Sequence, residues 1–217
     1  MSDITQNQET ASLVGAWERQ VANAFQVAHC RLVNSHASAH RLTLAALSSP
    51  LLGERAIGRG DEVILLGADL ADATVAVTQC GAVPVLVGAV CDGSITAALE
   101  SALSPCTRAV MTACVFHDDG DLLAVRNFCN EYELWMIEDV GDGLGHRHEI
   151  CGKHYYSGTV GDIGVGMLSA EAGGMTFTRD GMLAALLYDL REGEPSLTAT
   201  KEQVTRNFSL LEECLSR

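Results

Sequence analysis

The sequence has few basic residues and no long apolar run. Its 217 residues carry 14 Lys and Arg against 28 Asp and Glu, which gives a formal net charge of -14. A chain this acidic, without a Lys/Arg cluster, is a poor partner for phosphate backbones or anionic membrane surfaces, so we expect no nucleic-acid or membrane binding. No apolar stretch reaches ~18 residues, the length needed to span a bilayer. The segment 1–10 also lacks the basic start and apolar core of a signal peptide.

Several motifs of common sites are also absent. The eight cysteines form no C-x-x-C pair and lie in apolar surroundings. This usage favours reduced, mostly buried thiols and therefore a cytoplasmic protein. No serine triad, P-loop or G-x-G-x-x-G fingerprint follows a strand. Because 47% of the residues are hydrophobic, the chain can bury a sizeable core, either as one domain or as a domain with a short appendage.

Helix-like and strand-like segments alternate through most of the chain. Apolar spacing predicts helices over 11–28, 37–47, 71–79, 95–103, 122–130 and 182–190. Short apolar runs predict strands over 31–33, 62–66, 83–87, 109–114, 134–137, 162–168 and 174–178. Strands that are apolar throughout are covered on both faces, and this alternation indicates right-handed crossovers. The predicted fold class is therefore α/β, with a mostly parallel sheet flanked by helices.

The two ends of the chain lie outside this alternation. We expect residues 1–12 to be a flexible N-terminus, 13–192 to be the main domain, and 193–217 to be a linker and a C-terminal helix over about 201–215. Nothing follows that helix for its apolar face to pack on, so the face must fold back or meet another subunit. The face comprises Val204, Phe208, Leu211 and Leu215.

The most informative stretch is residues 134–145. An apolar strand ends there on Glu138 and Asp139, and Asp142 follows among three glycines. In an open α/β sheet, ligands bind beyond the carboxyl ends of the strands, so an acid at that edge faces the ligand. The alternative is that Asp139 only caps the turn after the strand.

Ordered motifs along the chain resemble the sugar aminotransferase and dehydrase family of fold-type-I pyridoxal-phosphate enzymes. The loop 49–56 (Ser-Pro-Leu-Leu-Gly-Glu-Arg-Ala) and the strand 134–139 (Leu-Trp-Met-Ile-Glu-Asp) are similar to its nucleotide-diphosphate 4-keto-6-deoxyhexose 3-dehydrase branch. The other matching motifs are 33–39 (Val-Asn-Ser-x-x-Ser-Ala), 60–64 (Gly-Asp-Glu-Val-Ile), Gly81-x-x-Pro84-Val85, Leu144-Gly145, Gly161-Asp162-Ile163-Gly164 and Gly173-Gly174. The resemblance covers roughly 13–192 and implies the family's large domain.

The resemblance also implies part of a cofactor pocket. Asp139 falls where the family places the acid that pairs with the pyridinium nitrogen, and Asp142 matches a second Asp of the dehydrase branch. Ser38 and the helix N-terminus would remain to attract a phosphate.

Other parts of that pocket are altered. His36 and Ala37 stand where the family has Gly followed by Ser or Thr. The side chain of His36 therefore hinders close approach of the backbone to the phosphate, and Ala37 has no hydroxyl that could donate to it. Leu70 stands where the family's ring-stacking aromatic falls.

The family's catalytic residue has no counterpart. Between Gly164 and Gly173 the family carries a Schiff-base lysine, or a histidine in the dehydrase branch, and this segment has neither. Lys153 and Lys201 lie elsewhere in the sequence. Without that group there is no internal aldimine and no proton shuttle, so aminotransferase or dehydrase activity of the chain alone is not expected. For the same reason no cofactor is expected, with pyridoxal phosphate binding only as a weak non-covalent ligand. The chain also ends where the family's small domain would begin.

Histidine-rich segments raise the question of metal binding. In the polar stretch 146–156, metal-ligating residue types gather, and H-x-H on a strand places both rings on one face. These are His146, His148, Cys151 and His154. A solvated hairpin explains them more simply, so no metal site is predicted. A strand end and a helix start could gather His29, Cys30, His36 and His40, but we expect these four to sit apart.

Three functions follow from these observations. The first is a non-catalytic homologue that acts as a partner or scaffold subunit in deoxysugar or secondary-metabolite biosynthesis. The family's sites form at dimer interfaces, so this hypothesis implies a homodimer or a heterodimer with a full-length homologue. The second is a repurposed enzyme without pyridoxal phosphate, with Asp139, Asp142, His36 and His40 as candidate catalytic groups. The third is a small-ligand or metal-binding protein.

Overall fold

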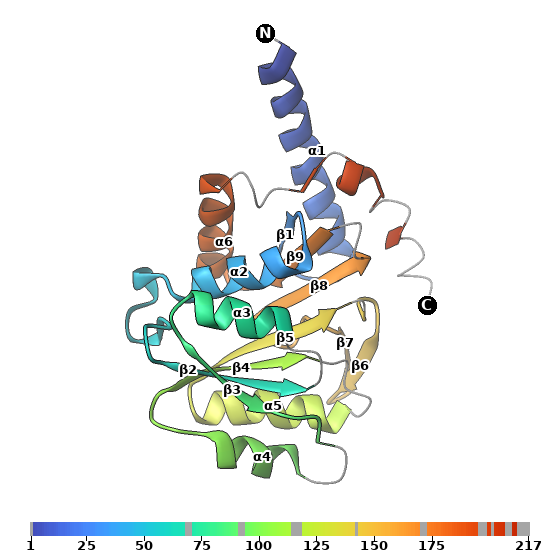
Figure 1. Cartoon of the computed structure of the whole chain (residues 1–217). Coiled ribbons are helices and arrows are strands. Elements are labelled where there is room, and N and C mark those ends of the chain that lie inside the picture. The colour runs from blue at the N-terminus through green and yellow to red at the C-terminus, as the bar shows by residue number, and fades with distance from the viewer. Residues whose placement is uncertain are drawn as a thin grey trace.

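A seven-stranded sheet with helices on both faces forms the centre of the molecule (Figure 1). The computed structural model describes residues 2–67, 71–90, 94–113, 119–141, 143–169, 173–194, 199–200, 202–206 and 210–211. The strands are β1 (His29–Val33), β2 (Glu62–Gly67), β3 (Val83–Val87), β4 (Thr107–Ala113), β5 (Trp135–Gly141), β6 (Arg147–Ile150), β7 (Lys153–Tyr156), β8 (Ile163–Ser169) and β9 (Gly173–Thr178). The helices are α1 (Ser2–Ala24), α2 (His36–Leu47), α3 (Ala71–Gln79), α4 (Ile95–Ala102), α5 (Asp119–Glu131) and α6 (Gly181–Gly193), with a 3-10 turn η1 (Pro50–Arg55).

The sheet is mostly parallel, as predicted. Its order is β1-β9-β8-β5-β4-β2-β3, and β6 and β7 form a separate hairpin. The neighbouring pairs β3–β2, β2–β4, β4–β5 and β5–β8 are parallel, whereas β9 runs antiparallel to both β8 and β1. The predicted α/β class is confirmed.

Alternating side chains of each strand enter different cores. In β2, Val63 and Leu65 pack with α2, α3 and α6, whereas Ile64 and Leu66 pack with α4 and α5. Figure 1 shows these two groups of helices on opposite sides of the sheet. Strands covered on both faces read as continuous apolar runs, which is why the sequence located them well.

The boundaries of some elements differ from the prediction. α1 begins at Ser2 and not near residue 11, so the segment 1–12, expected to be flexible, is helical from Ser2. β5 continues to Gly141 and not to residue 137, so Asp139 lies within the strand. Among the described residues, no helix is both long enough and apolar enough to cross a membrane.

The C-terminal segment packs on α1. Residues 202–206 and 210–211 are helical, and Val204 and Leu211 are buried in the core that contains Trp17 and Val21 of α1. Of the two predicted alternatives, these two side chains therefore fold back onto their own chain. Phe208 and Leu215 lie outside the described residues.

Close backbone contacts explain two of the glycine motifs. A Cβ on Gly164 would lie 2.0 Å from the Gly158 carbonyl oxygen, and a Cβ on Gly174 would lie 2.4 Å from the Ser35 carbonyl oxygen. Both distances are far below van der Waals contact, so only glycine fits without a backbone shift. These motifs position β8 and β9 against the loop before β8 and the start of α2.

Candidate functional site

The site is centred on Asp139, near the carboxyl end of β5. In this strand Trp135 and Ile137 face the core shared with α2, α3 and α6. Side chains two residues apart on a strand share a face, so Asp139 lies on the α2 side as well. The alternation of the strand therefore aims the carboxylate at the helix that follows β1.

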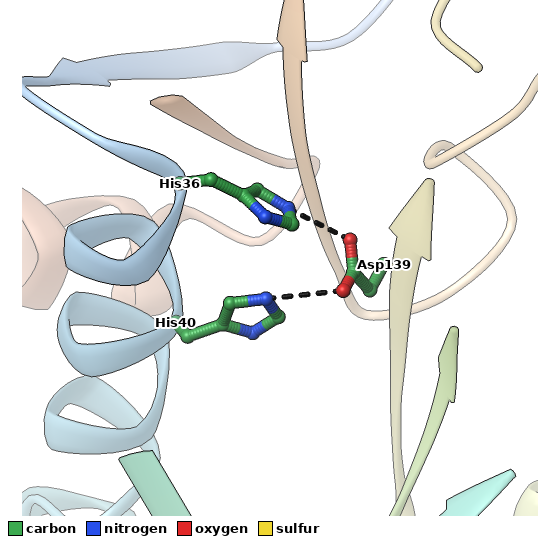
Figure 2. A group of neighbouring side chains, drawn as sticks. All are labelled: His36, His40 and Asp139. Carbon is green, nitrogen blue, oxygen red and sulfur yellow. Dashed lines mark hydrogen bonds and ion pairs between the residues drawn. The ribbon is translucent and has the colours of Figure 1, made fainter. Parts of the chain in front are cut away.

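Two histidines of α2 meet this carboxylate (Figure 2). His36 Nε2 lies 2.8 Å from Asp139 Oδ1, and His40 Nε2 lies 3.0 Å from Asp139 Oδ2. The spacing of four residues places both rings on one face of the helix, with ring centroids 4.6 Å apart. The Gly141 N–H also donates to Asp139 Oδ1, at 3.0 Å.

The hydrogen bonds of the cluster shift the pKa values of Asp139 and His36 in opposite directions. Burial would raise the pKa of Asp139, but the bonds from His36 and His40 and their positive charge outweigh it, and the pKa lies well below its usual range. Burial would lower the pKa of His36, but the bond to Asp139, with the negative charges of Asp139 and Asp72, raises it. Asp139 is therefore an ionised carboxylate held by two imidazoles.

The N-terminus of α2 is capped by its own side chains. Ser35 is the N-cap, and its hydroxyl accepts from the Ser38 N–H at 3.1 Å. The Ser38 hydroxyl donates to Asn34 Oδ1 at 2.7 Å. Ser38, predicted to attract a phosphate, thus takes part in the capping network.

Glu138 lies on the opposite face of β5 from Asp139. It is buried and accepts from the backbone N–H of Gly158 at 3.1 Å and of Val160 at 2.7 Å, and also from Gly161. Burial raises the pKa of Glu138, and these three bonds oppose that rise. Of the two predicted strand-end acids, Glu138 therefore anchors the loop before β8, and Asp139 faces the candidate site.

Within the part of the chain that the structure describes, the metal-ligating side chains of the histidine-rich hairpin do not gather into a cluster. His148 is buried, with its Nδ1 2.7 Å from Asp119 Oδ1 and its Nε2 2.9 Å from the Ser157 hydroxyl. His154 and Cys151 are exposed, and His154 pairs with Glu149 across the hairpin. His148 therefore ties the hairpin to α5, a role with no signal in the sequence, because Asp119 lies 29 residues from it along the chain.

The structure gathers a different set of predicted residues. Among the described residues, the only group of three or more His, Cys, Asp or Glu side chains that could share a metal ion is His36, His40 and Asp139. The expectation that the four residues His29, Cys30, His36 and His40 sit apart is wrong for His36 and His40, whose i, i+4 spacing was the available signal. Asp142 and Leu70 lie outside the described residues.

Comparisons with known proteins agree with the fold. The profile of the DegT/DnrJ/EryC1/StrS aminotransferase family matches residues 4–208. The chain is 34% identical over 185 residues to the lipopolysaccharide biosynthesis protein RfbH of Salmonella typhimurium, covering 82% of this chain and 41% of that protein. It is 31% identical over 184 residues to dTDP-4-dehydro-2,6-dideoxy-D-glucose 3-dehydratase of Saccharopolyspora spinosa, covering 81% of this chain and 39% of that enzyme.

A solved dehydratase has the same fold. GDP-4-keto-6-deoxymannose-3-dehydratase with a trapped PLP-glutamate geminal diamine superposes with a TM-score of 0.69 at 17% identity, covering 94% of this chain and 60% of that one. The present chain thus spans about two fifths of the length of the curated relatives, 41% and 39%.

These comparisons correct one expectation. The prediction that no cofactor is involved is wrong, because the family and its solved structures point to pyridoxal phosphate. The lysine that is absent between Gly164 and Gly173 would supply only the covalent attachment and the proton transfer, so its absence does not exclude non-covalent binding of the cofactor.

Proposed function

Because this chain belongs to the DegT/DnrJ/EryC1/StrS aminotransferase family, we propose that it is a partner subunit in deoxysugar biosynthesis that performs no transamination or dehydration by itself. The observation that carries this proposal is the connection between β8 and β9. β8 ends at Ser169 and β9 begins at Gly173, and the residues between, 170–172, are Ala-Glu-Ala. Neither a lysine nor a histidine occurs from Gly164 to Gly174.

Pyridoxal phosphate would be held through Asp139. This carboxylate is ionised and lies near the carboxyl end of β5, so it fits the role of the acid that pairs with the pyridine nitrogen. His36 now donates to one of its oxygens and would have to give way. When bound, the cofactor withdraws electrons from the substrate carbon next to the amine. With no lysine between β8 and β9, this chain would hold the cofactor without a covalent bond.

The partner subunit would supply the catalytic residue that is absent between β8 and β9. A lysine or histidine from a full-length homologue would have to reach the edge of the sheet where Asp139 lies. The named relatives act in lipopolysaccharide and deoxysugar biosynthesis, so a 4-keto sugar nucleotide is the proposed substrate class of such a pair. A homodimer of this chain would contain no such residue between β8 and β9 and is expected to be inactive.

The test uses the chain alone and together with a full-length family member from the same organism. Each preparation receives pyridoxal phosphate, glutamate and a 4-keto-6-deoxy sugar nucleotide, and products are separated by chromatography. We expect no turnover by the chain alone, co-elution with the homologue, and a change in that enzyme's rate. Turnover by the chain alone would disprove the proposal, as would failure to co-elute.

Cofactor binding is measured separately. After borohydride treatment, peptide mass spectrometry should find no pyridoxyl adduct in residues 164–174. Non-covalent binding, followed by fluorescence titration, should weaken at least about tenfold in Asp139→Asn, since removing a charged partner of a buried group costs more than 1.4 kcal/mol. Asp189→Asn, on the exposed face of α6, is the matched control and should bind like the unchanged chain.

A further inference from the structure

The side chains of His36 and His40, on α2, and of Asp139, on β5, converge on one place. The three offer one ligand atom each, and these atoms lie within 4.8 Å of one another. Figure 2 shows both imidazole rings directed at the two carboxylate oxygens. We propose that this cluster binds a divalent first-row transition-metal ion, with His36, His40 and Asp139 as its three protein ligands.

The distances suit one shared ion. Zinc lies about 2.0–2.2 Å from imidazole nitrogen and carboxylate oxygen, so two donors at a tetrahedral angle stand about 3.4 Å apart. The two nitrogen–oxygen distances here are 2.8 and 3.0 Å. Side-chain rotations that lengthen these two distances toward about 3.4 Å, and bring the widest pair of ligand atoms in from its limit of 4.8 Å, would form this geometry. The metal would then replace the protons now shared between each ring and the carboxylate.

The donor set selects the class of ion. Imidazole nitrogens suit zinc, iron, nickel and copper, whereas magnesium and calcium prefer oxygen ligands throughout. Two histidines and one carboxylate also leave coordination positions open, as in catalytic zinc sites and non-haem iron sites. Solvent reaches the cluster mainly at His36, whose side chain is 18% exposed. The side chains of His40 and Asp139 are only 1% and 8% exposed.

The charges around the cluster suit a cation. The charge of Asp72 acts on His36, and the whole chain carries a net charge of -14. Both favour the approach of a cation.

The ion and pyridoxal phosphate would compete for the same carboxylate. An oxygen of Asp139 that binds a metal cannot pair with a pyridine nitrogen at the same time. Metal binding is therefore measured on the chain alone, without cofactor or partner, so that its failure is distinct from failure of the proposed partner function.

The experiment removes metal with a chelator and then titrates zinc and cobalt(II) by calorimetry and visible absorption. We expect one equivalent per chain and the absorption of cobalt in a low-symmetry nitrogen and oxygen site. His36→Gln and Asp139→Asn should each lower the affinity at least about 100-fold, since even changes outside the ligand set cost 10–100-fold. His154→Gln, exposed on the hairpin, is the matched control and should bind like the unchanged chain.

The outcomes are separable even where a variant folds poorly. Circular dichroism of each metal-free variant checks folding, and the cobalt spectrum of the unchanged chain needs no variant. Absence of binding by the unchanged, folded chain would overturn the proposal. Equal affinity in folded His36→Gln would overturn it as well, and so would binding that is lost in His154→Gln.

Discussion

At the scale of single residues, the buried charges decide how α1, β1 and α6 are joined. Glu18 of α1 is buried and accepts from the Leu32 N–H at 2.9 Å, and it pairs with Arg191 of α6 and with Arg31 at 3.4 Å. Arg191 is itself buried and also donates to the Leu32 carbonyl oxygen. Without Glu18, the buried Arg191 would keep only the half-exposed Glu192 as its counter-charge, and such loss of a buried partner is strongly destabilising.

Glu18→Ala should therefore destabilise the fold strongly. Removing one partner of a buried pair costs about 3–5 kcal/mol, whereas an exposed pair contributes about 0–1 kcal/mol. Glu192→Ala is the matched control, because Glu192 also pairs with Arg191 but its side chain is 50% exposed. Urea denaturation of the two variants measures the difference, and similar losses in both would contradict this account of Glu18.

At the scale of elements, short contacts between strands and loops fix the positions of β8 and β9. The loop before β8 is held from one side by Glu138 and from the other by the Gly164–Gly158 contact described above. Asp162 adds to this by accepting from the Met136 N–H at 2.7 Å and pairing with Arg126 at 3.2 Å. Most of the Gly-Asp-Ile-Gly motif thus serves the architecture of the sheet edge.

Gly164→Ala should lower the free energy of unfolding by at least about 1–3 kcal/mol, the usual effect of inserting a methyl group where there is no room. Gly181→Ala is the control, since a Cβ at this first residue of α6 meets nothing within 4 Å. That change should be neutral or stabilising by up to about 1 kcal/mol, because alanine favours the helix. Thermal unfolding in both variants provides the measurement, and a tolerated Gly164→Ala would show that the loop can shift.

The sequence predicted the elements better than the contacts between them. Continuous apolar runs were enough to locate the strands, and apolar spacing was enough to locate α2, because local pattern determines these features. The pairing of His148 with Asp119 and Ser157 depends on how a hairpin packs against α5, which no local pattern encodes. The meeting of His36, His40 and Asp139 lies between these cases. The family resemblance placed Asp139 and His36 in one pocket, but no pattern in the sequence showed that both histidines bond to the carboxylate.

At the scale of the whole molecule, the cysteine thiols differ in how deeply they are buried. Cys30 and Cys129 are buried, and Cys106 and Cys151 are exposed. Burial raises the pKa of Cys129 to about 12. A rise of about three units from the ordinary value means about 1,000-fold less thiolate at any pH well below both values, and thiolate is the reactive form.

Iodoacetamide at pH 8 should therefore label Cys106 and Cys151 quickly and Cys129 at least about 1,000-fold more slowly. The raised pKa also means that folding favours the protonated thiol. Its contribution to stability is present below pH 9 and is lost as the pH rises toward 12. Peptide mass spectrometry over time gives the rates. Cys129→Ala should remove this part of the alkaline destabilisation, and labelling of Cys129 at the rate of Cys106 would contradict the burial described.

The adjacency of Glu138 and Asp139 has a consequence for how such a fold changes over generations. Glu138 holds the backbone of the sheet edge and Asp139 faces the candidate site, and the two lie on opposite faces of the strand. Mutations around the second can alter or abolish a reaction while the first preserves the folded chain. The residues that maintain the fold and the residues that carry the reaction can therefore change independently, so a protein can lose one reaction and acquire another without ceasing to fold.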